Sequence, residues 1–232
     1  MRNRILILFV FFGLAAWASA QDATPSSSGS GLGRFTISFG GGPGIGRGYV
    51  ANFVGNSVQA NAGFGYKLNR LFGVDAEYMY YDLDLRQSVK QGQSLPDATG
   101  RLQSVSLDGI VNVPHHIGKF GAYGIFGVGF DDRSVSANKQ LLEPGTVCQP
   151  TYYRWWGIDC VDYNTASPPT VSGAQTLSSY SRIAGSYNYG GGLTYQLQSW
   201  HHAKVYFEFR YHKAYQADAE TEVWPVTVGF RW

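Results

Sequence analysis

The sequence predicts an all-β fold: an eight-stranded, antiparallel, up-and-down transmembrane β-barrel preceded by a cleaved signal peptide. Apolar and polar residues alternate in eight runs, most of them long enough to cross a bilayer as tilted strands of about 9–11 residues. The connections between these runs are alternately long and short. Aromatic residues make up 16% of the chain and charged residues only 15%, and Gly occurs 30 times, which favours strands over helices.

The first 20 residues predict a secretory signal peptide. Two basic residues precede an apolar run, Ile5–Trp17, and the segment ends on the small residues Ala18-Ser19-Ala20. Removing these 20 of 232 residues leaves 212, and because Arg2 and Arg4 leave with them, 16 basic residues face 16 acidic ones. The mature chain therefore lacks the basic surplus that a nucleic-acid partner requires. It also has no apolar run of about 18 residues, which excludes a helical membrane protein.

Residues 21–33 are rich in Ser, Gly and Pro, and we expect them to form a flexible periplasmic leader. The barrel is expected to span residues 34–232. In the second run, for example, Val58, Phe64 and Leu68 alternate with Gln59 and Asn61. The predicted strands are, in order, Arg34–Gly44, Ser57–Leu68, Leu71–Asp82, Leu102–Val113, Lys119–Phe130, Ser181–Leu197, His202–Tyr215 and Glu222–Trp232.

The connections between the predicted strands differ in length at the two ends of the barrel. The long ones are Ile45–Asn56, Leu83–Arg101, Asp131–Tyr180 and the moderate Gln216–Thr221. The remaining connections, which alternate with the long ones along the chain, are short turns. Outer-membrane barrels have short periplasmic turns and long extracellular loops, so both chain ends are expected on the periplasmic side.

Alternation alone is also compatible with a soluble periplasmic ligand-binding barrel, in which the apolar face points inward. Aromatic residues near both ends of the apolar face favour the membrane instead. Phe35 and Trp232 fall near the predicted periplasmic rim, and Tyr80 and Trp224 near the outer one. Such aromatic belts are typical of the two membrane interfaces.

The last strand ends in Phe230 and Trp232, an alternating apolar pattern with an aromatic residue at the final position. This pattern resembles the terminal assembly signal of bacterial outer-membrane proteins, although Trp stands where Phe is usual. Over residues 34–232 the chain is similar to small barrels of the OmpA/OmpX type, the "porin family" outer-membrane β-barrel domain. The resemblance implies the outer membrane of a Gram-negative-type bacterium, contact with its lipid, and insertion by the barrel-assembly machinery. Because nothing follows the last strand, we expect no peptidoglycan-binding domain.

The interior of an eight-stranded barrel is only wide enough for side chains to fill. The alternation points charged residues inward at mid-height: Asp75, Glu77, Asp108, Glu208 and Arg210. Buried charges must be paired, so a structural salt-bridge plug is the main expectation. Four acids around one arginine leave a second interpretation open, a narrow water-filled path that prefers cations.

The long connection 131–180 contains the two cysteines of the chain, Cys148 and Cys160. A disulfide between them would stabilise by roughly 3 kcal/mol in the chain-entropy model. The bridge would either stiffen a surface flap or present exposed residues of the types enriched at binding hot spots. These possible contact residues are Tyr152, Tyr153, Arg154, Trp155 and Trp156.

We expect no catalytic residues, no metal site and no cofactor. His212 is the only histidine near the outer end, and an approach to it by Ser178, Ser179 or Ser181 is conjecture. The predicted role is structural or adhesin-like, with extracellular loops that meet a ligand the sequence does not identify. A narrow porin-like channel is the alternative, and a lipid A-modifying enzyme is a weaker one. The protein is expected to be monomeric.

Overall fold

The computed structural model describes residues 34–87, 97–114, 118–139, 146–150, 155, 158–162, 175–197, 203–216 and 220–232. The predicted signal peptide and leader lie outside these residues. Residues from Arg34 to Trp232 form one compact unit. Within the described part, no helix is both long enough and apolar enough to span a membrane.

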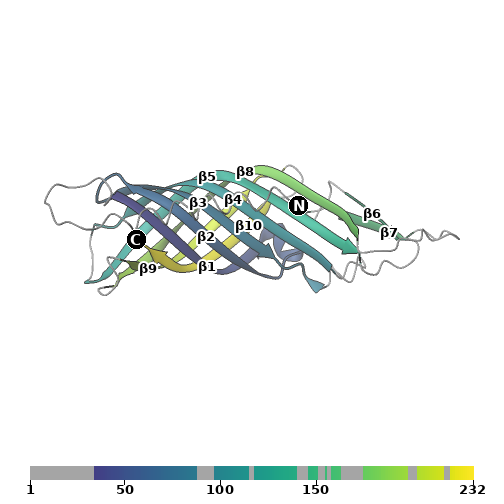
Figure 1. Cartoon of the computed structure of the whole chain (residues 1–232), viewed down its shortest axis with the longest axis horizontal. Coiled ribbons are helices and arrows are strands. Elements are labelled where there is room, and N and C mark those ends of the chain that lie inside the picture. Colours follow the sequence, from purple (N-terminus) through teal and green to yellow (C-terminus); the bar gives the residue numbers. More distant parts are fainter. Residues whose placement is uncertain are drawn as a thin grey trace. The chain divides into compact units, whose positions relative to one another are not determined.

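Ten strands and one short 3-10 helix make up the described part of this unit (Figure 1). They are β1 (Phe35–Arg47), η2 (Gly48–Asn52), β2 (Asn56–Lys67), β3 (Phe72–Leu83), β4 (Asp97–Asn112), β5 (Phe120–Lys139), β6 (Thr146–Pro150), β7 (Ile158–Asp162), β8 (Gln175–Gln196), β9 (Lys204–Ala214) and β10 (Thr221–Arg231). Eight of the strands form a closed barrel in the order β1-β10-β9-β8-β5-β4-β3-β2, and β6 pairs with β7 in a separate sheet. The predicted eight-stranded barrel is therefore confirmed.

The barrel closes where β1 meets β10. Their antiparallel register runs from Ser38 opposite Arg231 to Arg47 opposite Glu222. Every other pair of barrel neighbours is antiparallel as well. Closure satisfies the backbone hydrogen-bonding groups between strands, as a bilayer requires, and leaves no free sheet edge.

The apolar face of the strands points outward. Val58 and Val128 are each 67% exposed, Phe130 is 69% exposed and Ile183 is 72% exposed, whereas inward residues such as Glu208 are buried. A soluble barrel would place these side chains in its interior. Their exposure on all sides therefore excludes the periplasmic ligand-binding barrel.

The strands near the long loop extend further than the alternation predicts. β5 continues to Lys139 and β8 begins at Gln175, so much of the predicted loop 131–180 is a paired ladder, and β6 and β7 lie within it. β4 likewise begins at Asp97 rather than Leu102. The β5 extension carries polar residues on both faces: Arg133 lies on the buried face and Ser134 on the other. The extensions escape a search for period-two apolar residues because no hydrocarbon surrounds them.

Candidate functional site

The candidate site is the barrel interior, which has two regions of opposite character. The charge network at mid-height consists of Asp75, Glu77, Asp108, Glu208 and Arg210. The mouth cluster near the outer end consists of the buried residues Val50, Val54, Met79, Tyr81, Leu83, Leu85, Leu102, Val135, Trp155 and Val223. The first comes entirely from barrel strands, and the second also includes loop residues.

Arg210 on β9 is the centre of the charge network. Its Nε lies 2.5 Å from Glu208 Oε1, and its Nη1 lies 2.5 Å from Glu77 Oε2 and 3.2 Å from Asp108 Oδ2. All four side chains are almost completely buried. Strands β3, β4 and β9 thus bring together four of the five charged residues that the alternation places inward. One guanidinium contacts three carboxylates.

A shell of neutral donors surrounds these carboxylates. The Tyr123 hydroxyl donates to Glu208 Oε2 at 2.6 Å, and Asn188 Nδ2 donates to Asp108 Oδ1 at 2.9 Å. Asn61 Nδ2 donates to Glu77. Such donors stabilise buried charge that a single arginine cannot compensate. They are inward polar residues, so the alternation identifies their face, but it does not identify their partners.

Asp75 has a different environment from the other four residues. It lies directly opposite Asp108 in the ladder between β3 and β4, and it is buried. Among the described residues it makes no ion pair within 4.0 Å. Its carboxylate occupies space above Gly63 and Gly65, where a Cβ would lie 2.7 Å and 2.9 Å from its oxygens.

His212 on β9 lies nearer the outer end of the lumen than the charge network. Its Nε2 is 2.6 Å from Asp131 Oδ2, and Ser186 Oγ donates to Asp131 Oδ1 at 2.7 Å. Serine and histidine thus both bind the carboxylate, and no serine–histidine hydrogen bond is formed among the described residues. Ser181 donates to Asp132 instead. The side chains of Ser178 and Ser179 lie outside the described part.

Trp155 is the loop residue that covers the outer side of the mouth cluster. Its exposed fraction is 0%, and its indole Nε1 donates to Thr221 Oγ1 at 2.9 Å. The Arg133 guanidinium lies 5.0 Å from the ring centroid of Trp155, and the Phe53 ring stacks at 6.4 Å. The expectation that Trp155 is an exposed contact residue is therefore wrong. The inward residues at this end of the strands include the apolar side chains of the mouth cluster beside the buried polar residues Arg133, His212 and Thr221. The Trp155 ring covers the apolar ones and removes them from water.

The other predicted loop contacts, Tyr152, Tyr153, Arg154 and Trp156, lie outside the described residues. The backbone register of β6 and β7 places Cys148 directly opposite Cys160. Directly opposed residues of an antiparallel pair have Cα atoms roughly 4.5–5.5 Å apart, which suits a disulfide. The bridge itself stays a prediction.

The C-terminal strand presents its aromatic pair outward. The rings of Phe230 and Trp232 lie 6.1 Å apart, and the Trp232 amide donates to the Ile37 carbonyl at 2.9 Å. His115, His116, His201 and His202 fall outside the described part. Within that part, no group of three or more His, Cys, Asp or Glu side chains is arranged to hold a metal ion.

Comparisons with known proteins agree with this architecture. The family model described as "Outer membrane protein beta-barrel domain" matches residues 5–231. Neisserial surface protein A is similar in structure with a TM-score of 0.53 at 11% identity, over 88% of this chain and 98% of that one. A major outer membrane protein from Thermus thermophilus is similar with a TM-score of 0.50 at 13% identity, over 86% of this chain and 98% of that one. At these identities the likeness concerns the fold alone. No curated protein is significantly similar in sequence.

Proposed function

The chain belongs to the outer membrane protein β-barrel domain family and is located in the cell outer membrane, and from this premise we propose that it is a closed barrel with a structural, adhesin-like role. In this role the strands anchor the chain in the membrane, and the extracellular segments meet a ligand outside the cell. The proposal rests on how the outer mouth is filled and on how far two strands extend.

The single observation that carries the proposal is the mouth cluster. Ten buried apolar and aromatic residues meet above the charge network, with Trp155 inserted among them. An apolar constriction of this kind opposes the passage of water and ions. A barrel closed at its outer mouth suits anchoring and display better than transport.

The lengths of β5 and β8 support a display role. They contain 20 and 22 residues, whereas a transmembrane strand needs about 9–11. Both strands therefore extend well beyond the hydrocarbon layer, and β6 contacts β8 (Figure 1). The β6–β7 hairpin thus lies close to the ladder that β5 and β8 form.

The test compares bacteria that express the full chain with bacteria in which residues 146–162 are replaced by a short Gly-Ser linker. We expect the replacement to abolish adherence to cultured epithelial cells. The barrel itself should still show a heat-dependent shift in gel migration. Equal adherence of the two strains, with both barrels folded, would contradict the display role.

A narrow channel is the second candidate function, and Asp75 is the observation that favours it. A buried carboxylate opposite another carboxylate is stabilised by water or a cation. Recording from planar bilayers should then show small cation-preferring currents that Asp75→Asn or Glu208→Gln reduces. The absence of current in the parent chain, or currents that both variants leave unchanged, would count against a channel.

We propose further that the protein is not an enzyme. In the described part His212 is buried, and it pairs with a carboxylate rather than with a nucleophile. Mass spectrometry of lipid A should therefore give the same species whether cells express the parent chain or His212→Ala. A new species that appears only with the parent chain would support the enzyme instead.

A further inference from the structure

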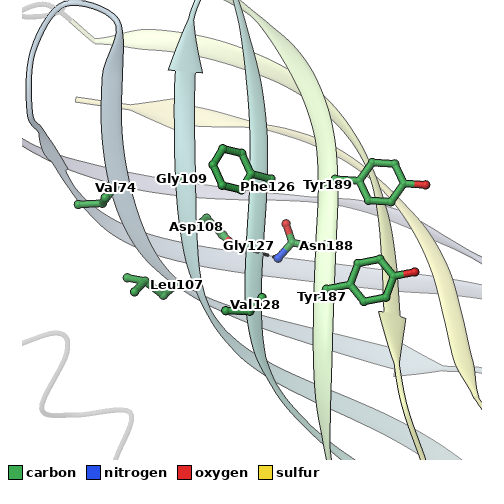
Figure 2. A pocket seen from close by; sticks show the side chains of 10 residues that line it. All are labelled: Val74, Leu107, Asp108, Gly109, Phe126, Gly127, Val128, Tyr187, Asn188 and Tyr189. Carbon is green, nitrogen blue, oxygen red and sulfur yellow. Dashed lines mark hydrogen bonds between the residues drawn. The ribbon is translucent and has the colours of Figure 1, made fainter.

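The membrane-facing wall of the barrel carries a groove of about 420 Å³ across β4, β5 and β8 (Figure 2). This volume lies within the range of small-molecule sites. The outward side chains around it are apolar or aromatic, and Leu107, Phe126 and Val128 are all more than half exposed. Asp108 and Asn188, which point toward the lumen, also line it. The groove is continuous with the outward apolar surface that contacts lipid.

Two glycines on neighbouring strands, Gly109 on β4 and Gly127 on β5, are among the residues that line the groove. A Cβ at Gly109 would lie 2.7 Å from Phe126 Cζ, so the Phe126 ring folds over the space that a side chain would need. Behind Gly127, on the lumen side, Asn188 donates to Asp108 at 2.9 Å. The missing side chain of Gly127 would point toward Asp108 in the lumen, so of the two glycines only Gly109 leaves space on the membrane side, and the Phe126 ring covers part of that space.

A tyrosine cluster continues from the groove toward the outer rim. Tyr187 and Tyr189 line the groove with nearly parallel rings, 6.3 Å apart at an interplanar angle of 8° (Figure 2). The Tyr187 ring also lies 5.7 Å from that of Tyr215 and 6.1 Å from that of Tyr211. β9 runs from the short-turn end toward the outer end, so Tyr215, just past its last residue, lies at the level of the outer lipid head groups with Tyr187 beside it. Tyr189 and Tyr211 lie lower, beside the groove.

The charges beside the tyrosine cluster balance one another. Lys213 Nζ lies 2.6 Å from Glu220 Oε2 and 3.1 Å from Glu222 Oε1. Arg47, directly opposite Glu222 in the ladder, lies over the Trp224 ring at 4.2 Å. Two cations thus face two carboxylates, and the described part of this rim offers no surplus positive charge to a phosphate.

We propose that the groove and the tyrosine cluster together bind one glycolipid of the outer leaflet, with an acyl chain in the groove and a sugar head group against the tyrosines. Hydrocarbon is the surrounding medium at the groove, so an acyl chain is the occupant that fits it. Tyrosine provides a flat apolar ring for the face of a sugar and a hydroxyl that exchanges hydrogen bonds with it. Because the positive and negative charges at the outer rim balance, the site favours an uncharged sugar head group over a phosphate. This inference rests on the outer-membrane location and is independent of the display role.

The test uses the full chain purified from outer membranes in mild detergent and analysed by native mass spectrometry. Val128→Trp fills the groove, and Val58→Trp is the matched control because Val58 is also outward and 67% exposed. Filling the groove should lower the fraction of protein with a bound glycolipid by about tenfold, the effect of two displaced methylenes. The control should leave that fraction unchanged. If Val128→Trp does not fold, as judged by heat-dependent gel migration, Leu107→Phe takes its place.

The head-group part is tested with a phosphate-free acylated disaccharide and a phospholipid of equal chain length, each added to delipidated protein. The parent chain should retain the disaccharide lipid in preference, and Tyr187→Phe combined with Tyr215→Phe should remove that preference. Equal losses for Val128→Trp and Val58→Trp, or no loss for either, would overturn the site. Equal retention of the two lipids by the parent chain would overturn the sugar head group.

Discussion

The two halves of the lumen are filled by opposite chemistry. At mid-height one guanidinium contacts three carboxylates, and tyrosine and amide side chains complete their hydrogen bonds. At the outer mouth, by contrast, apolar residues pack around an indole supplied by a distant loop. The lumen is therefore filled in two ways. At mid-height the barrel strands supply charged side chains, and at the outer mouth a residue outside the barrel strands, Trp155, inserts its side chain.

This difference implies different responses to substitution. Removing one member of a buried ion network leaves the remaining charges uncompensated, so the whole fold loses stability. Removing an apolar residue at the mouth leaves a space that water can enter, so the loss stays near the loops. The charge network should therefore control global stability, and the mouth cluster should control access to the lumen.

The largest expected effect follows Arg210→Met. Three buried carboxylates lose their common cation, and the free energy of unfolding in detergent should fall by about 3–5 kcal/mol. This loss of unfolding free energy is measured by denaturant titration, with the heat-dependent shift in gel migration as the readout. The control is Lys213→Met, which breaks partly exposed ion pairs with Glu220 and Glu222 at the rim and should lower the stability far less. Equal losses for the two variants would show that the network does not set the stability of the barrel.

Trp155→Ala tests the mouth. Deleting a buried Trp side chain typically costs about 3–5 kcal/mol, but here we expect a smaller effect on the barrel because the loss is confined to its outer end. Currents in planar bilayers should rise if the indole blocks the lumen. Trp224→Ala is the control, since Trp224 packs outward against Phe209. Currents unchanged in Trp155→Ala would mean that the rest of the cluster closes the lumen without the indole.

The charge network is more predictable from the sequence than the mouth is. Period-two alternation assigns each strand residue to a face, so the amino-acid pattern alone places Arg210 and its acidic partners in the lumen. Which carboxylates Arg210 contacts depends on the register between strands, and alternation does not fix the register. For the same reason the alternation groups Asp75 with the network, although Arg210 does not bridge it.

The mouth could not be predicted because its key residue belongs to no regular pattern. Trp155 lies between β6 and β7, where local sequence offers only aromatic residues near two cysteines. Aromatic rings there suggest a binding surface or a core equally well. The apolar inward residues Leu83, Leu102 and Val135 are the available signal, because apolar side chains at the outer end of the lumen need a cover that removes them from water.

A smaller effect is expected for His212→Ala. The change removes one of the two hydrogen-bond partners of the buried Asp131 carboxylate and leaves only the Ser186 hydroxyl. Losing this charge-assisted hydrogen bond should lower the free energy of unfolding by about 1–3 kcal/mol. Ser181→Ala removes the exposed partner of Asp132 and should cost less than about 0.5 kcal/mol. Denaturant titration compares the two. A negligible loss for His212→Ala would mean that water replaces the imidazole, and hence that water reaches this level of the lumen.

The smallest effect on the barrel should follow Cys148→Ser combined with Cys160→Ser. A bridge across β6 and β7 would restrict the unfolded hairpin by roughly 3 kcal/mol, but it closes a short loop that lies outside the barrel sheet. Limited proteolysis should therefore cut the hairpin faster, while the denaturant midpoint of the barrel stays within error. The reduced parent chain should behave like the double variant, and an unchanged cleavage rate in both would contradict the bridge. If the barrel also lost stability, the hairpin and the mouth cluster would form one cooperative unit, because Trp155 connects them.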